Sequence, residues 1–143
     1  MTRIEFYFNV ADKQQAIADL VQSALLKRRQ VMVLAADEKM ASDVSASLWQ
    51  NKPASFLPNV QENHLNAAVT PVVIGLHGSD LMQDDMLINL TTNTPVFFSR
   101  FTQLVELVSD DAQDKAAART RFKFYRDRGY EIKSIDHAQH KIE

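Results

Sequence analysis

The sequence predicts an α/β fold in which a central, mostly parallel sheet is flanked by helices. Residues 31–35, VMVLA, form a continuous apolar run of the kind found in strands that are covered on both faces. Elements at the start of the chain alternate in the order strand, helix, strand, helix, and parallel strands need such crossovers. The length of 143 residues suits one domain spanning residues 1–143 with a core of its own.

The first half of the chain supplies the strand and helix units of this pattern. Residues 4–10 are rich in aromatic and β-branched residues, which predicts a strand, and Asp12 is expected to cap the helix that follows. Apolar residues recur at spacings of three and four over residues 13–29, which is typical of a helix. Asp37 is expected to cap a second helix. From 50 to 70 neither period persists, so this stretch is predicted to be irregular.

The second half begins with three further predicted strands, at residues 71–76, 86–90 and 95–99. Within residues 100–108 the apolar positions are spaced for one helical face, so a short helix is predicted there. These positions are Phe101, Leu104, Val105 and Val108.

A longer helix is predicted to begin at a cap within residues 109–111, SDD, and to run to Arg128. Gly129 stands at the position after the C-terminus that glycine favours, and residues 130–135 can supply a last strand.

Composition narrows the classes of function. The net charge of −2 argues against wholesale coating of nucleic acid, so any electrostatic function must be local. The chain has no cysteine, which removes disulfides, thiol nucleophiles and cysteine-based metal sites. No apolar stretch approaches the ~18 residues that a membrane-spanning helix needs. The protein is therefore expected to be soluble and cytoplasmic, with no contact to a membrane.

Phosphate-binding and catalytic motifs are missing. The sequence holds three glycines and neither a Gly-x-x-x-x-Gly-Lys-Ser/Thr nor a Gly-x-Gly-x-x-Gly loop, so the fold is expected to be Rossmann-like without a phosphate-binding glycine loop. His137 and His140 lack a third metal ligand nearby and are interpreted as surface residues. His77, Ser79 and Asp80 lack the sequence context of a hydrolase triad. We expect no catalytic residues, no cofactor and no metal.

A cationic stripe marks the helix predicted before Gly129. Six of the chain's sixteen Lys and Arg residues lie within residues 115–128. On a helix, one stripe would carry Lys115, Arg119, Phe122 and Arg126, with Lys123 at its edge and with Phe124 and Ala117 projecting from the opposite side as an apolar face.

Three interpretations of this stripe remain open. It can be a solvated helix face. It can bind an acidic peptide that ends in an aromatic residue, because cations pair with carboxylates and Phe122 offers an apolar floor. It can also bind single-stranded nucleic acid, with bases stacked on the ring. A second candidate surface, or a set of residues that pins a loop to the core, consists of Trp49, Phe56, Leu57 and Pro58.

The chain resembles the chi subunit family of bacterial DNA polymerase III holoenzyme from end to end. The resemblance rests on the FYF of the first strand, on LWQNKPASFLPN, on MLINLT followed by PVFFSRFTQLVELV, and on RTRFKFYRDRGY. It implies a non-enzymatic α/β subunit of the clamp-loader assembly. In that family one surface binds the psi subunit, or in some members a competing helicase of the XPD/DinG-like type, and another binds the acidic, phenylalanine-ended tail of single-stranded DNA-binding protein.

Carried over by position, the resemblance assigns two surfaces and leaves any link to nucleic acid indirect. The tail-binding positions that match are Lys115, Arg119, Phe122 and Lys123, and the psi or helicase positions that match are Trp49, Phe56 and Pro58. Arg126 joins the first surface because it lies on the same helical stripe, and Leu57 joins the second as part of the same apolar segment. Phe122 stands where the family often has Tyr, and Asn59 where it often has His. The alternatives are a nucleotide-binding enzyme of Rossmann-like fold and a direct single-stranded nucleic-acid binder.

Overall fold

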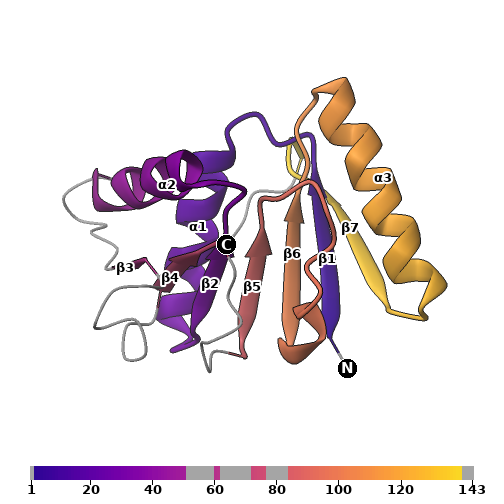
Figure 1. The fold of residues 1–143 in the computed structure, drawn as a ribbon, viewed down its shortest axis with the longest axis horizontal. Helices are drawn as coiled ribbons and strands as arrows, with labels where there is room; N and C mark the ends of the chain where they lie inside the picture. The colour runs from indigo at the N-terminus through magenta and orange to yellow at the C-terminus, as the bar shows by residue number, and fades with distance from the viewer. Residues whose placement is uncertain (1, 51–59, 62–71, 77–83, 140–143) are drawn as a thin grey trace.

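The computed structural model describes residues 2–50, 60–61, 72–76 and 84–139, and its strands form one parallel sheet (Figure 1). The sheet has seven strands in the order β3-β4-β2-β5-β6-β1-β7, and every neighbouring pair is parallel. The strands are β1 (Arg3–Phe8), β2 (Val31–Leu34), β3 (Val60–Gln61), β4 (Val72–Gly75), β5 (Met86–Asn89), β6 (Gln103–Leu107) and β7 (Ile132–Asp136). The helices are α1 (Lys13–Leu26), α2 (Glu38–Gln50), the short 3-10 helix η2 (Phe98–Arg100) and α3 (Ala112–Asp127). The predicted α/β class with a parallel sheet is confirmed.

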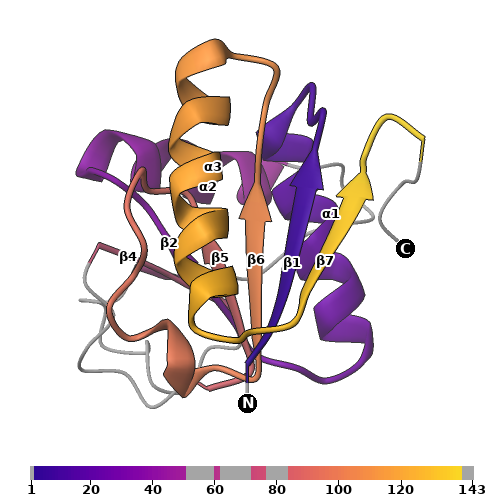
Figure 2. The same ribbon diagram turned by 90° about the vertical axis from the view of Figure 1, so that its right-hand side faces the viewer.

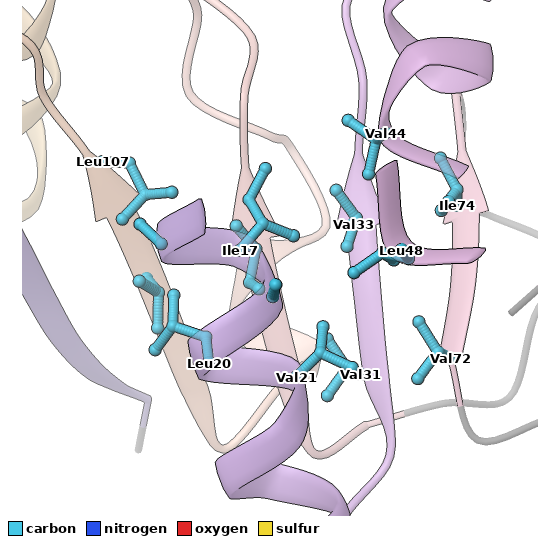
Figure 3. Packing of buried hydrophobic residues seen from close by; sticks show 14 of the residues in the cluster. Ile17, Leu20, Val21, Val31, Val33, Val44, Leu48, Val72, Ile74 and Leu107 are labelled. Atoms are coloured by element: carbon cyan, nitrogen blue, oxygen red, sulfur yellow. The ribbon is translucent and has the colours of Figure 1, made fainter. Parts of the chain in front are cut away.

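Helices cover both faces of the sheet, with α1 and α2 on one face and α3 on the other (Figures 1 and 2). All four residues of β2 are buried, and their side chains alternate between the two faces. Val31 and Val33 belong to the hydrophobic cluster under α1 and α2, whereas Met32 and Leu34 belong to the cluster under α3. Figure 3 shows Ile17, Leu20 and Val21 of α1 beside this first group, together with Val44 and Leu48 of α2.

The predicted helix ends are held by the expected caps. The backbone N–H of Gln15 donates to the Asp12 carboxylate, and that of Met40 donates to the Asp37 carboxylate at 2.8 Å. Asp111 caps α3 in the same way, which satisfies backbone donors that have no partner within the helix. The prediction extends α1 to Arg29, whereas the helix ends three residues earlier, at Leu26. The chain then turns at Arg28, whose φ is 57°.

Two predictions for residues 95–108 are wrong. Residues 95–99 form no strand, because the chain turns at Val96, which is 95% exposed, and then enters η2. Residues 103–107 form the strand β6 rather than a helix, and this strand lies between β5 and β1.

The helical spacing within this segment has a simple origin. Leu104 and Val108 pack in the cluster under α3, while Val105 packs under α1. A strand that buries both faces is apolar at nearly every position, so the same residues also fit the period of a helix.

The stretch from 50 to 70, predicted to be irregular, contributes Val60–Gln61 as the short edge strand β3, which pairs with β4. The prediction missed this strand because two residues carry no readable period. Gln50 is the last residue of α2, and the rest of that stretch lies outside the described residues. Among the helices that the structure describes, none is long and apolar enough to cross a membrane.

Candidate functional site

Helix α3 faces the sheet with three buried residues, Ala118, Arg121 and Tyr125. Their spacing of three and four puts them on one stripe of the helix. The apolar face predicted at Ala117 and Phe124 is therefore wrong by about one position, although Phe124 is half-buried and packs against the same cluster. The difference arises because the predicted face left out Arg121, a charged residue that here is 3% exposed.

The stripe next to this buried face forms one wall of an open groove of about 710 Å³. The predicted cationic stripe is brought together here, because Lys115, Arg119, Phe122, Lys123 and Arg126 all line the groove. The remaining lining residues come from Ala118 of α3, from β1 and the residues after it, from the end of β6 and from β7: Phe6, Phe8, Asn9, Val108, Ser109 and Ser134. Sequence reasoning missed this sheet side, since it is assembled from three distant segments.

Phe122 gives the groove an apolar floor. Its half-buried ring lies edge-on against Phe6, with ring centroids 5.3 Å apart and an interplanar angle of 62°. Phe6 is itself buried, whereas Phe8, two residues along the same strand, is 37% exposed. The floor therefore offers apolar ring surface of the kind on which another aromatic ring packs favourably.

The cations around Phe122 are available to a ligand. Within the part of the chain that the structure describes, Lys115, Arg119 and Lys123 make no ion pair, and the pair of Arg126 with Asp127 is exposed, with 3.7 Å between Nε and Oδ1. Such an exposed pair contributes little to stability and is readily exchanged. The groove therefore presents a cluster of positive charge over an aromatic floor.

One carboxylate close to the groove already has a cationic partner of its own. Asp114 lies at the start of α3 and pairs with Lys13 at 2.9 Å. The backbone N–H and the hydroxyl of Ser109 each donate to the same carboxylate oxygen at 2.8 Å. Although burial opposes the effect, these hydrogen bonds and the Lys13 ammonium lower the pKa of Asp114. The groove keeps its positive character because this acid is held by other partners.

A buried polar network under α3 fixes how the helix sits on the sheet. Glu106 of β6 is 0% exposed and accepts from Arg121 Nε at 3.0 Å and from the Tyr125 hydroxyl at 2.7 Å. Asn89 donates to the same carboxylate at 3.1 Å, and Arg121 also donates to the Thr92 carbonyl at 3.0 Å. Burial raises the pKa of Glu106, against the opposing effects of Arg121, Tyr125 and Asn89.

Sequence reasoning did not identify this network. A usable signal was present, since Arg121 and Tyr125 lie four residues apart in a helix and Glu106 interrupts an apolar run. The network anchors the buried stripe of Ala118, Arg121 and Tyr125. The stripe that lines the groove lies next to it on the same helix.

Other predicted positions fall elsewhere. Trp49 belongs to the last turn of α2, but its side chain and residues Phe56, Leu57 and Pro58 lie outside the described residues. The same holds for His77, Ser79, Asp80 and His140.

His137, predicted to be a surface residue, is half-buried with its ring edge-on to Tyr7 at 6.4 Å between centroids. Across the described ranges, no group of three or more His, Asp or Glu side chains could hold a metal ion.

Comparison with known proteins gives a consistent family assignment. The family model described as "DNA polymerase III chi subunit, HolC" matches residues 1–133. A DNA polymerase III subunit chi of Pseudomonas aeruginosa is 32% identical over 148 residues, covering 99% of this chain and 100% of that protein. Proteins of the same name from Haemophilus influenzae and Escherichia coli are 29% and 27% identical, each over 120 residues, covering 83% of this chain and 83% and 82% of those proteins. The chain therefore belongs to the DNA polymerase III chi subunit family, a family of non-catalytic accessory subunits.

Proposed function

We propose that this chain links DNA polymerase III to single-stranded DNA-binding protein by holding that protein's acidic, aromatic-ended C-terminal tail in the groove beside α3. A second surface, formed by Trp49, Phe56, Leu57 and Pro58, would bind the psi subunit of the clamp loader or a competing XPD/DinG-like helicase. The observation that carries the proposal is a half-buried Phe122 ringed by four cations in one groove.

The chemistry of the groove suits such a tail. The terminal aromatic ring would lie on Phe122 beside the exposed part of Phe8, which removes apolar surface from water. Arg119 can form two parallel hydrogen bonds with a carboxylate, and Lys115 and Lys123 attract the other acids as point charges. Because these cations face solvent, binding should be weak, with a Kd in the micromolar range, which corresponds to a binding free energy of about −8 kcal/mol. The affinity should fall as the salt concentration rises.

A titration with a synthetic acidic peptide ending in Phe tests the groove. Arg119→Ala is expected to weaken peptide binding by about tenfold or more, because it removes a charge-assisted contact, and to leave the melting temperature unchanged. Arg128→Ala is the matched control, since it removes the same charge from α3's C-terminal end, where Arg128 stacks on Phe124 at 3.5 Å and does not line the groove. Equal losses from both variants would mean that net charge, and not this groove, attracts the peptide.

The second surface needs a separate measurement. Phe56→Ala is expected to impair capture of purified psi while tail-peptide affinity is unchanged. Loss of tail binding in a folded Phe56→Ala variant would contradict the assignment of two independent surfaces. Anisotropy with a labelled oligonucleotide, with and without the tail-bearing protein, distinguishes bridged from direct binding, and direct binding by the chain alone would contradict the bridging role.

A further inference from the structure

Among the residues that the structure describes, no strand pairs with the outer edge of the sheet next to the groove. Strand β7 is the last in the strand order, and within the described part of the chain its one strand neighbour is β1 (Figure 2). The N–H of Ile4 donates to the Glu131 carbonyl, and the N–H of His137 donates to the Phe8 carbonyl. Backbone groups along a strand point alternately to either side. The N–H and C=O groups of Ile132 and Ser134 therefore point away from the sheet, whereas the Asp136 carbonyl already accepts from the N–H of Gln139 at 3.1 Å.

This edge continues directly from the groove. Ser134 lines the groove and is paired with Phe6, whose ring lies under Phe122. A peptide whose terminal ring sits on Phe122 therefore has the β7 edge beside the rest of its chain. We infer that the acidic residues upstream of the terminal aromatic residue add to β7 as an extra strand, with backbone hydrogen bonds to Ile132 and Ser134. This inference rests on the proposed function of the groove.

Positive charge on both faces of the sheet edge suits an acidic strand. Along an added strand, alternate side chains point to opposite faces. On the α3 face they would meet the groove cations. On the α1 face lies a second, polar pocket of about 380 Å³ whose lining includes four cations, Arg3, Lys27, Arg29 and Lys133, and one acid, Glu5.

The cations of this second pocket are mostly unpaired. Arg29 donates to Gln103 at 2.6 Å and to Thr102 at 3.2 Å, whereas Arg3, Lys27 and Lys133 make no ion pair among the residues described. Cross-strand neighbours on one face lie about 5 Å apart, so an acid opposite Lys133 would pair with it.

The same lysine argues against a second copy of this chain at the edge. Lys133 stands at the third of five positions of β7, so antiparallel pairing of two β7 strands would bring their lysines close together on one face. A lysine on an edge strand is a known device against pairing of like edges. Lys133 therefore favours pairing of β7 with an acidic strand over pairing with β7 of a second molecule.

Backbone methylation of the ligand tests the added strand. In a synthetic acidic peptide ending in Phe, we expect N-methylation at alternate upstream positions to weaken binding to the full chain by roughly fivefold for each hydrogen bond lost, while the positions between them have little effect. On the protein side, Ser134→Pro removes an outward N–H and should weaken binding by a similar factor. Ser134→Ala keeps the N–H and removes only the hydroxyl, so it separates the two effects and should weaken binding less than Ser134→Pro.

Amide hydrogen exchange gives a readout that does not depend on a variant folding. On peptide binding, the exchange of Ile132 and Ser134 should slow at least tenfold, because these N–H groups gain partners. If the unmodified peptide binds in an Arg119-dependent way but these amides exchange as before and methylation has no effect, the added strand is refuted and the groove function stands. If the peptide does not bind, the proposed function itself fails. Dimerisation of the free chain through β7 would also overturn the inference.

Discussion

Arg121→Met is expected to destabilise the protein strongly, because it leaves a buried carboxylate without its counter-charge. Glu106 is 0% exposed, Arg121 is 3% exposed, and 3.0 Å separates Arg121 Nε from Glu106 Oε1. Removing one partner of such a pair costs roughly 3–5 kcal/mol. A domain of this size has a free energy of unfolding of only about 5–15 kcal/mol. The melting temperature should therefore fall by roughly 10–15 °C.

The loss should depend on pH in a defined direction. Burial already raises the pKa of Glu106, and removal of Arg121 should raise it further above the value of about 4.3 of an unfolded glutamate. The folded variant then binds a proton that the unfolded chain does not. The free-energy cost of the buried Glu106 charge is complete above the pKa of Glu106 in the folded variant, and it disappears below the pKa of Glu106 in the unfolded chain. Arg121→Met should therefore lose less stability at about pH 5 than at about pH 8.

Urea unfolding of the wild type and the variant at these two pH values measures the effect. The double variant Glu106→Gln/Arg121→Met is the control, because it buries no charge while its amide oxygen can still accept from Tyr125. We expect the double variant to be more stable than Arg121→Met at about pH 8 and nearly insensitive to pH. An equal loss at both pH values, or a double variant no more stable than the single one, would refute the role assigned to this ion pair.

Three further predictions concern single residues. Gly129→Ala should lower the free energy of unfolding by about 1 kcal/mol in urea unfolding, because Gly129 has a φ of 81° that L residues rarely adopt. A Cβ at this position would meet no atom within 4 Å, so the loss would come from the backbone and not from a clash. No loss would mean that the helix end relaxes. Phe122→Ala should abolish tail-peptide binding and lower stability by about 1–2 kcal/mol through the lost contact with Phe6, whereas Phe122→Tyr should still bind. Burial and the Glu5 carboxylate raise the pKa of Tyr7 to about 12, so stability should fall as pH rises from about 10 towards 12. An ultraviolet titration should show this late ionisation, and Glu5→Gln should move it earlier; an unchanged curve would remove Glu5 as a cause.

Local patterns in the sequence were sufficient for α3 and its cationic stripe. The positions of Lys115, Arg119, Phe122 and Arg126 follow from the period of a helix, and Asp111 and Gly129 supply its ends. These features depend on residues within a few turns of one another, so they can be predicted without knowledge of the fold.

Tertiary structure alone decided the buried face of α3 and the far side of the groove. Arg121 is charged and reads as a surface residue, yet it is buried because Glu106, fifteen positions earlier in the sequence, lies opposite it on a central strand. Phe8 and Ser134 line the groove because two parallel strands from opposite ends of the chain pair at the sheet edge. In the same way, the segment carrying Leu104 and Val105 fits a helical period, and its burial on both faces makes it a strand. Sequence periodicity reports local geometry, whereas burial and charge pairing depend on which distant segments the fold brings together.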